Sequence, residues 1–169
     1  ILPSLADQSI TPNLMQRLIC FKMLKEKRLG NWSGTGAGKT FSAVIASKLI
    51  GAKVTVIICP NNVIPEWEKT IPRAFPQAKV LVKESLKIIS ANAEAPVYVV
   101  LNYEYFQQPL CRHELQNLID NHQIDFCILD EVHFTKQRLK NKMSIRKNNV
   151  FWFIQKVGEK NSNLHVLGM

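Results

Sequence analysis

The stretch that decides the fold is Ser33-Gly34-Thr35-Gly36-Ala37-Gly38-Lys39-Thr40. It matches the phosphate-binding pattern G-x-x-x-x-G-K-[ST] except at its first position, where serine replaces glycine. Glycines let the backbone curl so that several N–H groups face phosphate oxygens, and a helix that begins near Lys39 adds its positive dipole end. We therefore expect an ATP-binding P-loop, in which Lys39 reaches the β- and γ-phosphates and the Thr40 hydroxyl binds Mg²⁺. The loop residues expected around the phosphates are Gly34, Thr35, Gly36, Ala37 and Gly38.

Short apolar runs alternate with helical stretches on both sides of this loop. Strands are predicted at residues 28–32, 53–59, 79–82, 97–101, 124–129 and 165–169. Helices are predicted from Thr11-Pro12 onward, at 39–50, from a cap at Asn62 through 67, within 106–122 and near 144–157. Apolar strands separated by helices indicate an α/β fold, with a parallel sheet flanked by helices as a three-layer sandwich. A chain of 169 residues is enough for one such domain.

An acidic pair follows the strand predicted at 124–129. Asp130 and Glu131 come directly after this apolar run, and ligands of parallel sheets gather at the carboxyl ends of the strands. We expect Asp130 to bind Mg²⁺ and Glu131 to polarise the attacking water. An ordinary acidic loop is the alternative, which the upstream P-loop disfavours. Asp125 precedes the strand and is expected to be a solvated turn residue.

Charge and cysteine content narrow the partners and the compartment. The 22 Lys and Arg against 13 Asp and Glu give a net charge of +9, which suits a polyanionic partner, although a charge that serves only solubility would look the same. The four cysteines form no zinc-binding spacing and are typical of small core residues in a reducing compartment, cytoplasmic or nuclear. The apolar runs are too short to span a bilayer, so no membrane partner is expected. The excess of positive charge lies in two stretches: Lys22, Lys25, Lys27 and Arg28, then Lys136, Arg138, Lys140, Lys142, Arg146 and Lys147.

Asp130-Glu131-Val132-His133 resembles the D-E-x-H box of superfamily 2 helicases and translocases. The loop at 33–40 resembles the A-x-x-G-x-G-K-T variant of that family. The stretch at 58–67 is similar to motif Ia of the chromatin-remodeller-like branch, and Leu101-Asn102-Tyr103-Glu104 is similar to a later nucleic-acid contact of that branch. Residues 166–169 resemble the strand that leads into the Ser-Ala-Thr motif. The resemblance thus runs from about Thr11 to Met169.

The resemblance implies the N-terminal, RecA-like ATP-binding lobe of a helicase or of a double-stranded DNA translocase. It implies that His133 couples the nucleotide site to a second lobe, and that Gln16 reads the adenine edge; an exposed helix position is the alternative for Gln16. DNA is the expected partner ahead of RNA. The implied nucleic-acid contacts are Pro60, Asn61, Asn62, Asn102, Tyr103 and Arg138. For Tyr103, packing under the sheet edge is an equal alternative, and Arg138 and its basic neighbours could instead form a solvated face.

The chain ends before the Ser-Ala-Thr motif and begins at Ile1 rather than Met, which indicates a truncated piece without its second lobe. Because an arginine finger from that lobe completes such sites, we expect the isolated lobe to bind ATP weakly and hydrolyse it slowly. Two other classes stay open. One is a different P-loop enzyme, such as a small-molecule kinase or an oligomeric loader ATPase. The other is a binding module that keeps the fold without turnover.

Overall fold

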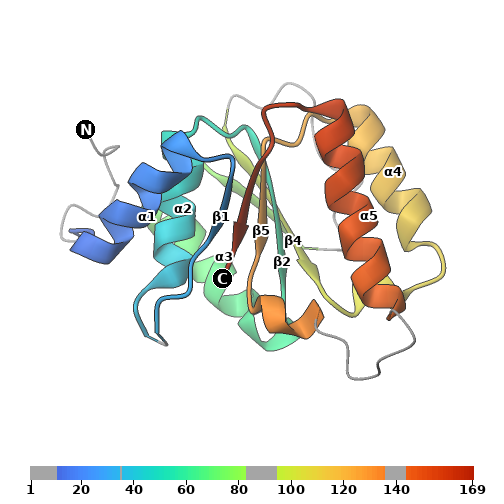
Figure 1. The fold of residues 1–169 in the computed structure, drawn as a ribbon, viewed down its shortest axis with the longest axis horizontal. Helices are drawn as coiled ribbons and strands as arrows, with labels where there is room; N and C mark the ends of the chain where they lie inside the picture. The colour runs from blue at the N-terminus through green and yellow to red at the C-terminus, as the bar shows by residue number, and fades with distance from the viewer. Residues whose placement is uncertain (1–10, 35, 83–94, 136–143) are drawn as a thin grey trace.

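A six-stranded, wholly parallel sheet organises the computed structural model, which describes residues 11–34, 36–82, 95–135 and 144–169 (Figure 1). The strand order is β1-β6-β5-β2-β4-β3. The strands are β1 (Arg28–Gly30), β2 (Val54–Cys59), β3 (Lys79–Val82), β4 (Val97–Asn102), β5 (Phe126–Leu129) and β6 (His165–Gly168). The helices are α1 (Leu14–Lys25), α2 (Lys39–Leu49), α3 (Ile64–Ala74), α4 (Cys111–Asn121) and α5 (Ile145–Lys160). Short 3-10 turns are η1 (Asn61–Val63), η3 (Tyr105–Gln107) and η4 (Val132–Thr135).

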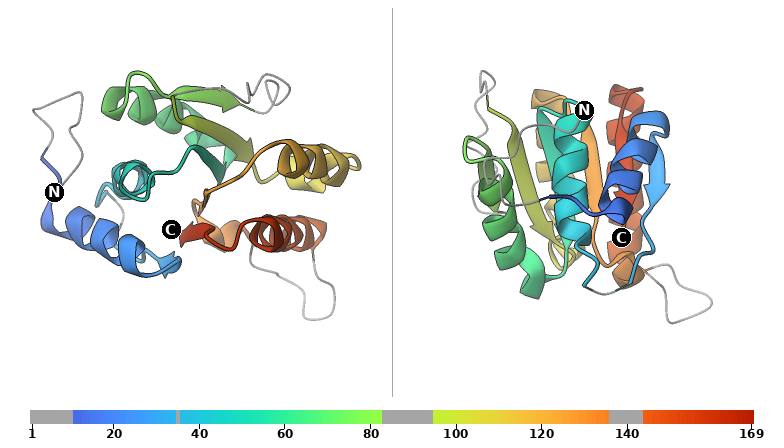
Figure 2. Two further views of the ribbon diagram at one scale, coloured as in Figure 1. Left: turned by 90° about the horizontal axis from the view of Figure 1, so that it is seen from above. Right: turned by 90° about the vertical axis from the view of Figure 1, so that its left-hand side faces the viewer.

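Helices cover both faces of the sheet, which gives the predicted three layers (Figure 2). Successive side chains of a strand point to opposite faces, so each central strand contributes to two cores. In β2, for example, Val56 and Ile58 join the core that includes residues of α4 and α5, whereas Ile57 and Cys59 join the core that includes residues of α1, α2 and α3. The unbroken apolar pattern of the sequence therefore reflects burial on both faces.

Two helix starts differ from the sequence prediction. Helix α1 begins after Asn13 rather than at Thr11-Pro12, because the Asn13 side chain accepts a hydrogen bond from the Gln16 backbone N–H and caps the helix. Helix α3 is not capped by Asn62, which lies in η1, and it continues beyond Trp67 to Ala74. Helix α4 (Cys111–Asn121) lies within the predicted range, and the turn η3 precedes it. The other predicted elements are present within one to three residues at each end.

All strands end at one edge of the sheet, and backbone hydrogen bonds continue beyond them. Asn31 N–H donates to the Gly168 carbonyl at 2.7 Å, Asp130 N–H to Ile58 at 2.8 Å, and Tyr103 N–H to Cys59 at 3.1 Å. This carboxyl edge lies at the lower side of Figure 1. It brings together the segments that follow β1, β2, β4 and β5, which carry the predicted site. Within the described ranges, no helix is long and apolar enough to cross a membrane.

Candidate nucleotide site at the carboxyl edge

The glycine-rich loop between β1 and α2 has the backbone shape that the sequence predicts. Gly36 and Gly38 have φ values of 78° and 73°, in the left-handed region that favours glycine. Gly38 immediately precedes the first turn of α2, so the unpaired N–H groups of this helix point into the loop. The Lys39 ammonium donates to the carbonyls of Ser33 at 3.1 Å and Gly34 at 3.2 Å, which holds it inside the loop. Thr35 lies outside the described residues.

Serine at the first loop position has a structural reason. The Asn31 side chain is buried, and its Oδ1 accepts hydrogen bonds from the Ser33 hydroxyl at 2.8 Å and from the Ser33 backbone N–H at 3.3 Å. These bonds fix the start of the loop directly after β1. Asn31 thus stabilises the departure from the usual glycine, a role that the sequence did not indicate.

Gln16 lies against the phosphate loop and is buried, which contradicts the alternative of an exposed helix residue. Its Nε2 donates to the Gly38 carbonyl at 3.4 Å, and its Oε1 accepts from the Asn13 N–H at 2.9 Å. A Cβ built on Gly38 would lie 2.4 Å from Gln16 Nε2, so a larger residue would displace this amide, and the φ of 73° itself favours glycine. Gln16 therefore caps α1 and touches the loop with one side chain.

Asp130 is held in a buried position beside the same loop. Its side chain is 6% exposed, and the Trp67 indole N–H donates to Oδ2 at 3.0 Å. Burial raises the pKa of Asp130 and the charge of Glu131 raises it further, whereas the Trp67 hydrogen bond and the charge of Lys39 lower it. The positive charge of Lys39 is thus near enough to stabilise the Asp130 carboxylate. The segments that carry Lys39 and Asp130 follow β1 and β5 at the same edge of the sheet, and their convergence on one nucleotide stays a prediction.

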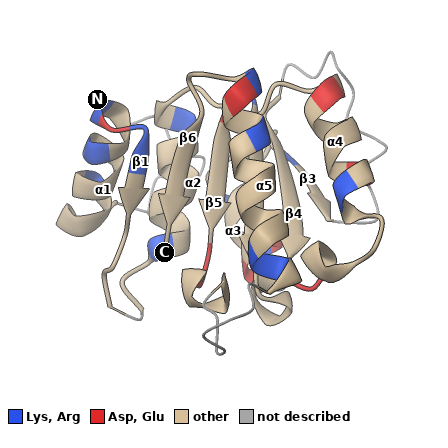
Figure 3. Cartoon of the chain, turned by 45° about the vertical axis from the view of Figure 1, so that its right-hand side comes forward, with Lys and Arg blue, Asp and Glu red and all other residues tan. Residues whose placement is uncertain are grey.

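Glu131 has a strained backbone and pairs with His133. Its φ is 53°, the only positive value at a non-glycine position among the described residues, and such a conformation costs about 1 kcal/mol or more. The Glu131 carboxylate lies 3.0 Å from His133 Nδ1, and both side chains are about half exposed. The acidic tip of β5 is visible in Figure 3. The D-E-x-H segment therefore presents one buried carboxylate and one exposed carboxylate in contact with a histidine.

The predicted nucleic-acid contacts divide into surface and interior residues. Asn61 and Asn62 are exposed, and Asn102 Nδ2 donates to Asn61 Oδ1 at 3.1 Å, so the turns after β2 and β4 meet. Pro60 is buried and has no backbone N–H, so its contact with nucleic acid stays a prediction. The Tyr103 side chain is fully buried, which agrees with the alternative that it packs under the sheet edge. Arg138 lies outside the described residues.

Two aromatic side chains donate hydrogen bonds to Asp130, and the sequence did not predict either bond. Trp67 is fully buried, and its hydrogen bond to the Asp130 carboxylate joins residues 63 positions apart. The Tyr103 hydroxyl donates to the Asp130 backbone carbonyl at 2.9 Å. The only signal in the sequence was the polar tip of each aromatic side chain, which needs a partner when it is buried.

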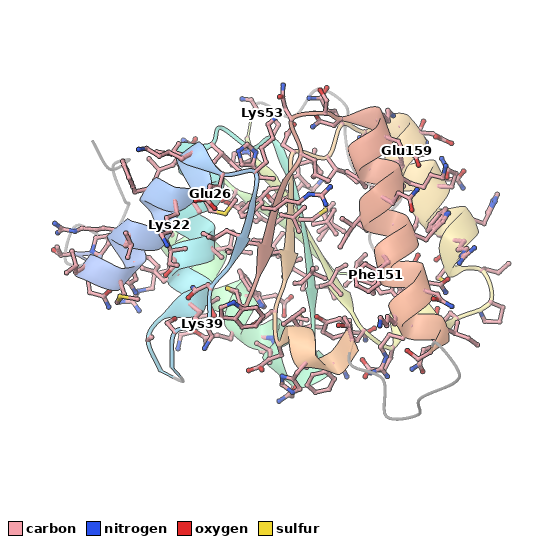
Figure 4. All side chains as sticks on the ribbon, viewed as in Figure 1. Lys22, Glu26, Lys39, Lys53, Phe151 and Glu159 are labelled. Atoms are coloured by element: carbon pink, nitrogen blue, oxygen red, sulfur yellow. The ribbon has the colours of Figure 1, made fainter. Side chains whose placement is uncertain are left out.

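Asp125 lies at the edge of the sheet opposite the site. The prediction that it is a solvated turn residue was wrong. Asp125 is only half-buried, yet its carboxylate accepts from the backbone N–H groups of Lys53 at 2.8 Å and Val54 at 3.2 Å. It therefore anchors the start of β2 rather than being a solvated turn residue. Figure 4 shows Lys39 and Lys53 at opposite ends of the sheet.

A family model described as type III restriction enzyme, res subunit, matches residues 8–169. The chain belongs to this family. A comparison with curated proteins gives no match. Among solved structures, the chain is similar to the SWI2/SNF2 ATPase core of Sulfolobus solfataricus, solved in complex with double-stranded DNA, with 14% identity and a TM-score of 0.63 over 99% of this chain and 33% of the other. It is also similar to the UvsW helicase of bacteriophage T4, with 17% identity and a TM-score of 0.61 over 99% of this chain and 54% of the other.

The two similar structures show the fold of the chain, and the match to the res-subunit model shows its family. The chain is an N-terminal RecA-like lobe of the superfamily 2 helicase type, which confirms the family and fold predicted from the motifs. It spans about a third of one solved relative and about half of the other.

Proposed function

We propose that the intact protein hydrolyses Mg²⁺-ATP in order to move along nucleic acid, with double-stranded DNA as the preferred track. The observation that carries this proposal is the shared sheet edge. Lys39 and Asp130 follow strands at this edge, and the turns that carry the exposed Asn61 and the half-buried Asn102 follow neighbouring strands there. Short polar side chains at such turns suit phosphate contacts without base readout. The Sulfolobus relative, which was solved with double-stranded DNA, supports DNA ahead of RNA.

The residues present fit a magnesium nucleotide. Among the described residues, no group of three or more His, Cys, Asp and Glu side chains converges, so a cation here would depend on phosphate oxygens for much of its shell, as Mg²⁺ commonly does. Thr40 and Asp130 would hold the metal, which neutralises charge on the phosphates when bound. The backbone of 34–38 would cradle the phosphates, Gln16 would lie on the adenine side, and Lys39 would stabilise the β- and γ-phosphates.

Glu131 is the proposed base for the attacking water. Its carboxylate is partly exposed at the tip of β5, where it can accept a proton, while Asp130 is held by Trp67. His133 binds the Glu131 carboxylate and would relay its position to a second RecA-like lobe. We infer that lobe, outside residues 1–169, from the greater length of the solved relatives, and we expect the isolated lobe to turn over slowly without it. Four free, buried cysteines suit a reducing compartment, cytoplasmic or nuclear.

The proposal is tested by ATP hydrolysis in the full-length protein with duplex DNA, single-stranded DNA or RNA. We expect stimulation by duplex DNA, and a loss of roughly 100-fold or more in turnover for Lys39→Ala. Lys48→Ala is the matched control, because Lys48 is exposed at the other end of α2, and it should keep full activity. A wild-type protein that no polynucleotide stimulates would overturn the proposal. Stimulation by RNA alone would overturn the preference for DNA.

A further inference from the structure

Tyr103 connects the turn after β4 with the acidic pair after β5. It follows Asn102 directly, is fully buried, and donates its hydroxyl to the Asp130 carbonyl at 2.9 Å. Its ring lies parallel to Phe134 with centroids 5.7 Å apart, and Phe134 in turn contacts the His133 ring at 4.8 Å. One side chain thus touches the segment that carries Asp130, Glu131 and His133 at two places.

The carbonyl that Tyr103 holds belongs to the peptide group between Asp130 and Glu131. The strained φ of 53° at Glu131 begins at this peptide, so its orientation determines where the Glu131 carboxylate points. A strained backbone persists only when its surroundings fix it. Trp67 fixes the Asp130 carboxylate, and Tyr103 fixes the peptide that follows.

The other end of this connection lies on the polar surface. Asn102 donates to Asn61 at 3.1 Å and accepts from the Tyr105 N–H at 2.8 Å, so the turn that carries Tyr103 is braced against the turn after β2. A polynucleotide that binds these asparagines would act on the backbone at the root of Tyr103. The rigid Tyr103 side chain therefore links the turn at Asn102 to the peptide that precedes Glu131.

We propose that Tyr103 is a positioning residue that couples polynucleotide binding at Asn61 and Asn102 to the placement of Glu131. This inference rests on the proposed function and names the regulation of that site. Bound polynucleotide favours the turn geometry in which the Tyr103 hydroxyl holds the peptide, so Glu131 is set for the attack of water. Coupling of this kind is reciprocal, so nucleotide bound at the site must also change the affinity for polynucleotide.

The chain provides matched controls, since all three of its tyrosines are buried and hydrogen-bonded through their hydroxyls. Tyr98 pairs with Ser47 at 2.6 Å and Tyr105 with Glu114 at 2.6 Å, and neither hydroxyl bond involves the acidic pair. Replacement by phenylalanine removes one buried hydroxyl in each case. Only Tyr103→Phe releases the peptide before Glu131.

The experiment uses the full-length protein with Tyr103→Phe, Tyr98→Phe and Tyr105→Phe. We expect Tyr103→Phe to lower the stimulation of turnover by duplex DNA about tenfold, since loss of one hydrogen bond is worth about a factor of ten, while KM for ATP stays within about twofold. A second readout is DNA affinity with and without a non-hydrolysable ATP analogue. The coupling ratio, which is the DNA affinity with the analogue divided by the affinity without it, should fall toward one in Tyr103→Phe. It should stay at the wild-type value in both controls.

Four outcomes decide the inference. If Tyr103→Phe matches the controls in a wild-type protein that DNA stimulates, the inference is overturned and the proposed function stands. If all three variants lose coupling equally, the effect is general destabilisation and the inference is overturned as well. If wild type shows no stimulation, the proposed function and the inference fall together. If Tyr103→Phe does not fold, Phe134→Leu, which removes the stacked ring at the surface, must lower the coupling ratio, and an unchanged ratio overturns the inference.

Discussion

Gln16 has two structural tasks at the residue scale, and they can be separated. Its Oε1 accepts from Asn13 in a reciprocal cap, and its Nε2 reaches the Gly38 carbonyl in the phosphate loop. Reading adenine would require the same amide atoms to exchange these partners. The neighbouring residue Asn13 shares only the capping task.

We therefore compare Gln16→Ala with Asn13→Ala. Both substitutions break the capping box and should lower the free energy of unfolding by about 1 kcal/mol. Only Gln16→Ala removes the contact with the phosphate loop, so only it should weaken ATP binding, by roughly five- to tenfold. Calorimetric titration with ATP and urea unfolding provide the two readouts. Equal losses of ATP affinity would show that Gln16 acts only as a cap.

At the element scale, Asp125 determines how β2 starts beside β5. Its Oδ2 accepts from two consecutive backbone N–H groups, and its Oδ1 lies 3.4 Å from the Asn161 amide nitrogen at the end of α5. A carboxylate with several donors joins two strands and a helix at the edge away from the site. Sequence position alone could not indicate this, because Lys53 is 72 residues away.

Asp125→Ala should lower the free energy of unfolding by about 2 kcal/mol, because charge-assisted hydrogen bonds are lost and backbone donors remain. ATP affinity should not change, since the site lies at the opposite edge. The matched control is Asp120→Ala, which removes an exposed carboxylate that accepts a hydrogen bond from the Gln116 side chain, and we expect a change within about 0.5 kcal/mol. Urea unfolding measures both variants. A loss for Asp125→Ala as small as that for Asp120→Ala would contradict the anchoring role.

At the scale of the whole molecule, the two cores bury every cysteine. All four thiols are free and buried among apolar side chains. Burial raises the pKa of Cys127 to about 12 from 9.0 and the pKa of Cys20 to about 11, and burial together with the charge of Asp130 raises that of Cys59 to about 12. The folded state therefore keeps these protons at a pH where the unfolded chain loses them.

These raised pKa values make the stability of the fold depend on pH. Above pH 9 the unfolded state binds fewer protons than the folded state, so stability is fully present below pH 9 and falls as the pH rises toward 12. Cys127 alone should contribute a loss of roughly 1 kcal/mol between pH 9 and pH 10. Urea unfolding at pH 8, 9 and 10 in reducing buffer measures this slope, and Cys127→Ala should make it shallower. An unchanged slope in the variant would refute the contribution of this thiol.

The sequence by itself determined the phosphate loop, the acidic pair and the layered parallel fold. Each of these depends on residues close together in the chain: glycines beside Lys39, and two carboxylates directly after an apolar strand. Because parallel strands place their carboxyl ends at one edge, the position of Lys39 and Asp130 at the same edge also followed from the pattern. The family match agrees with these local motifs.

Only the tertiary structure decided which side chains hold this site in place. Tyr103 and Asp130 are 27 residues apart, and Trp67 and Asp130 are 63 apart. Their hydrogen bonds depend on the register of β2 with β4 and β5, and on how α3 packs against the sheet. A shift of one residue in a strand would turn its side chains to the other face, so these partners are fixed by packing between distant elements rather than by local sequence.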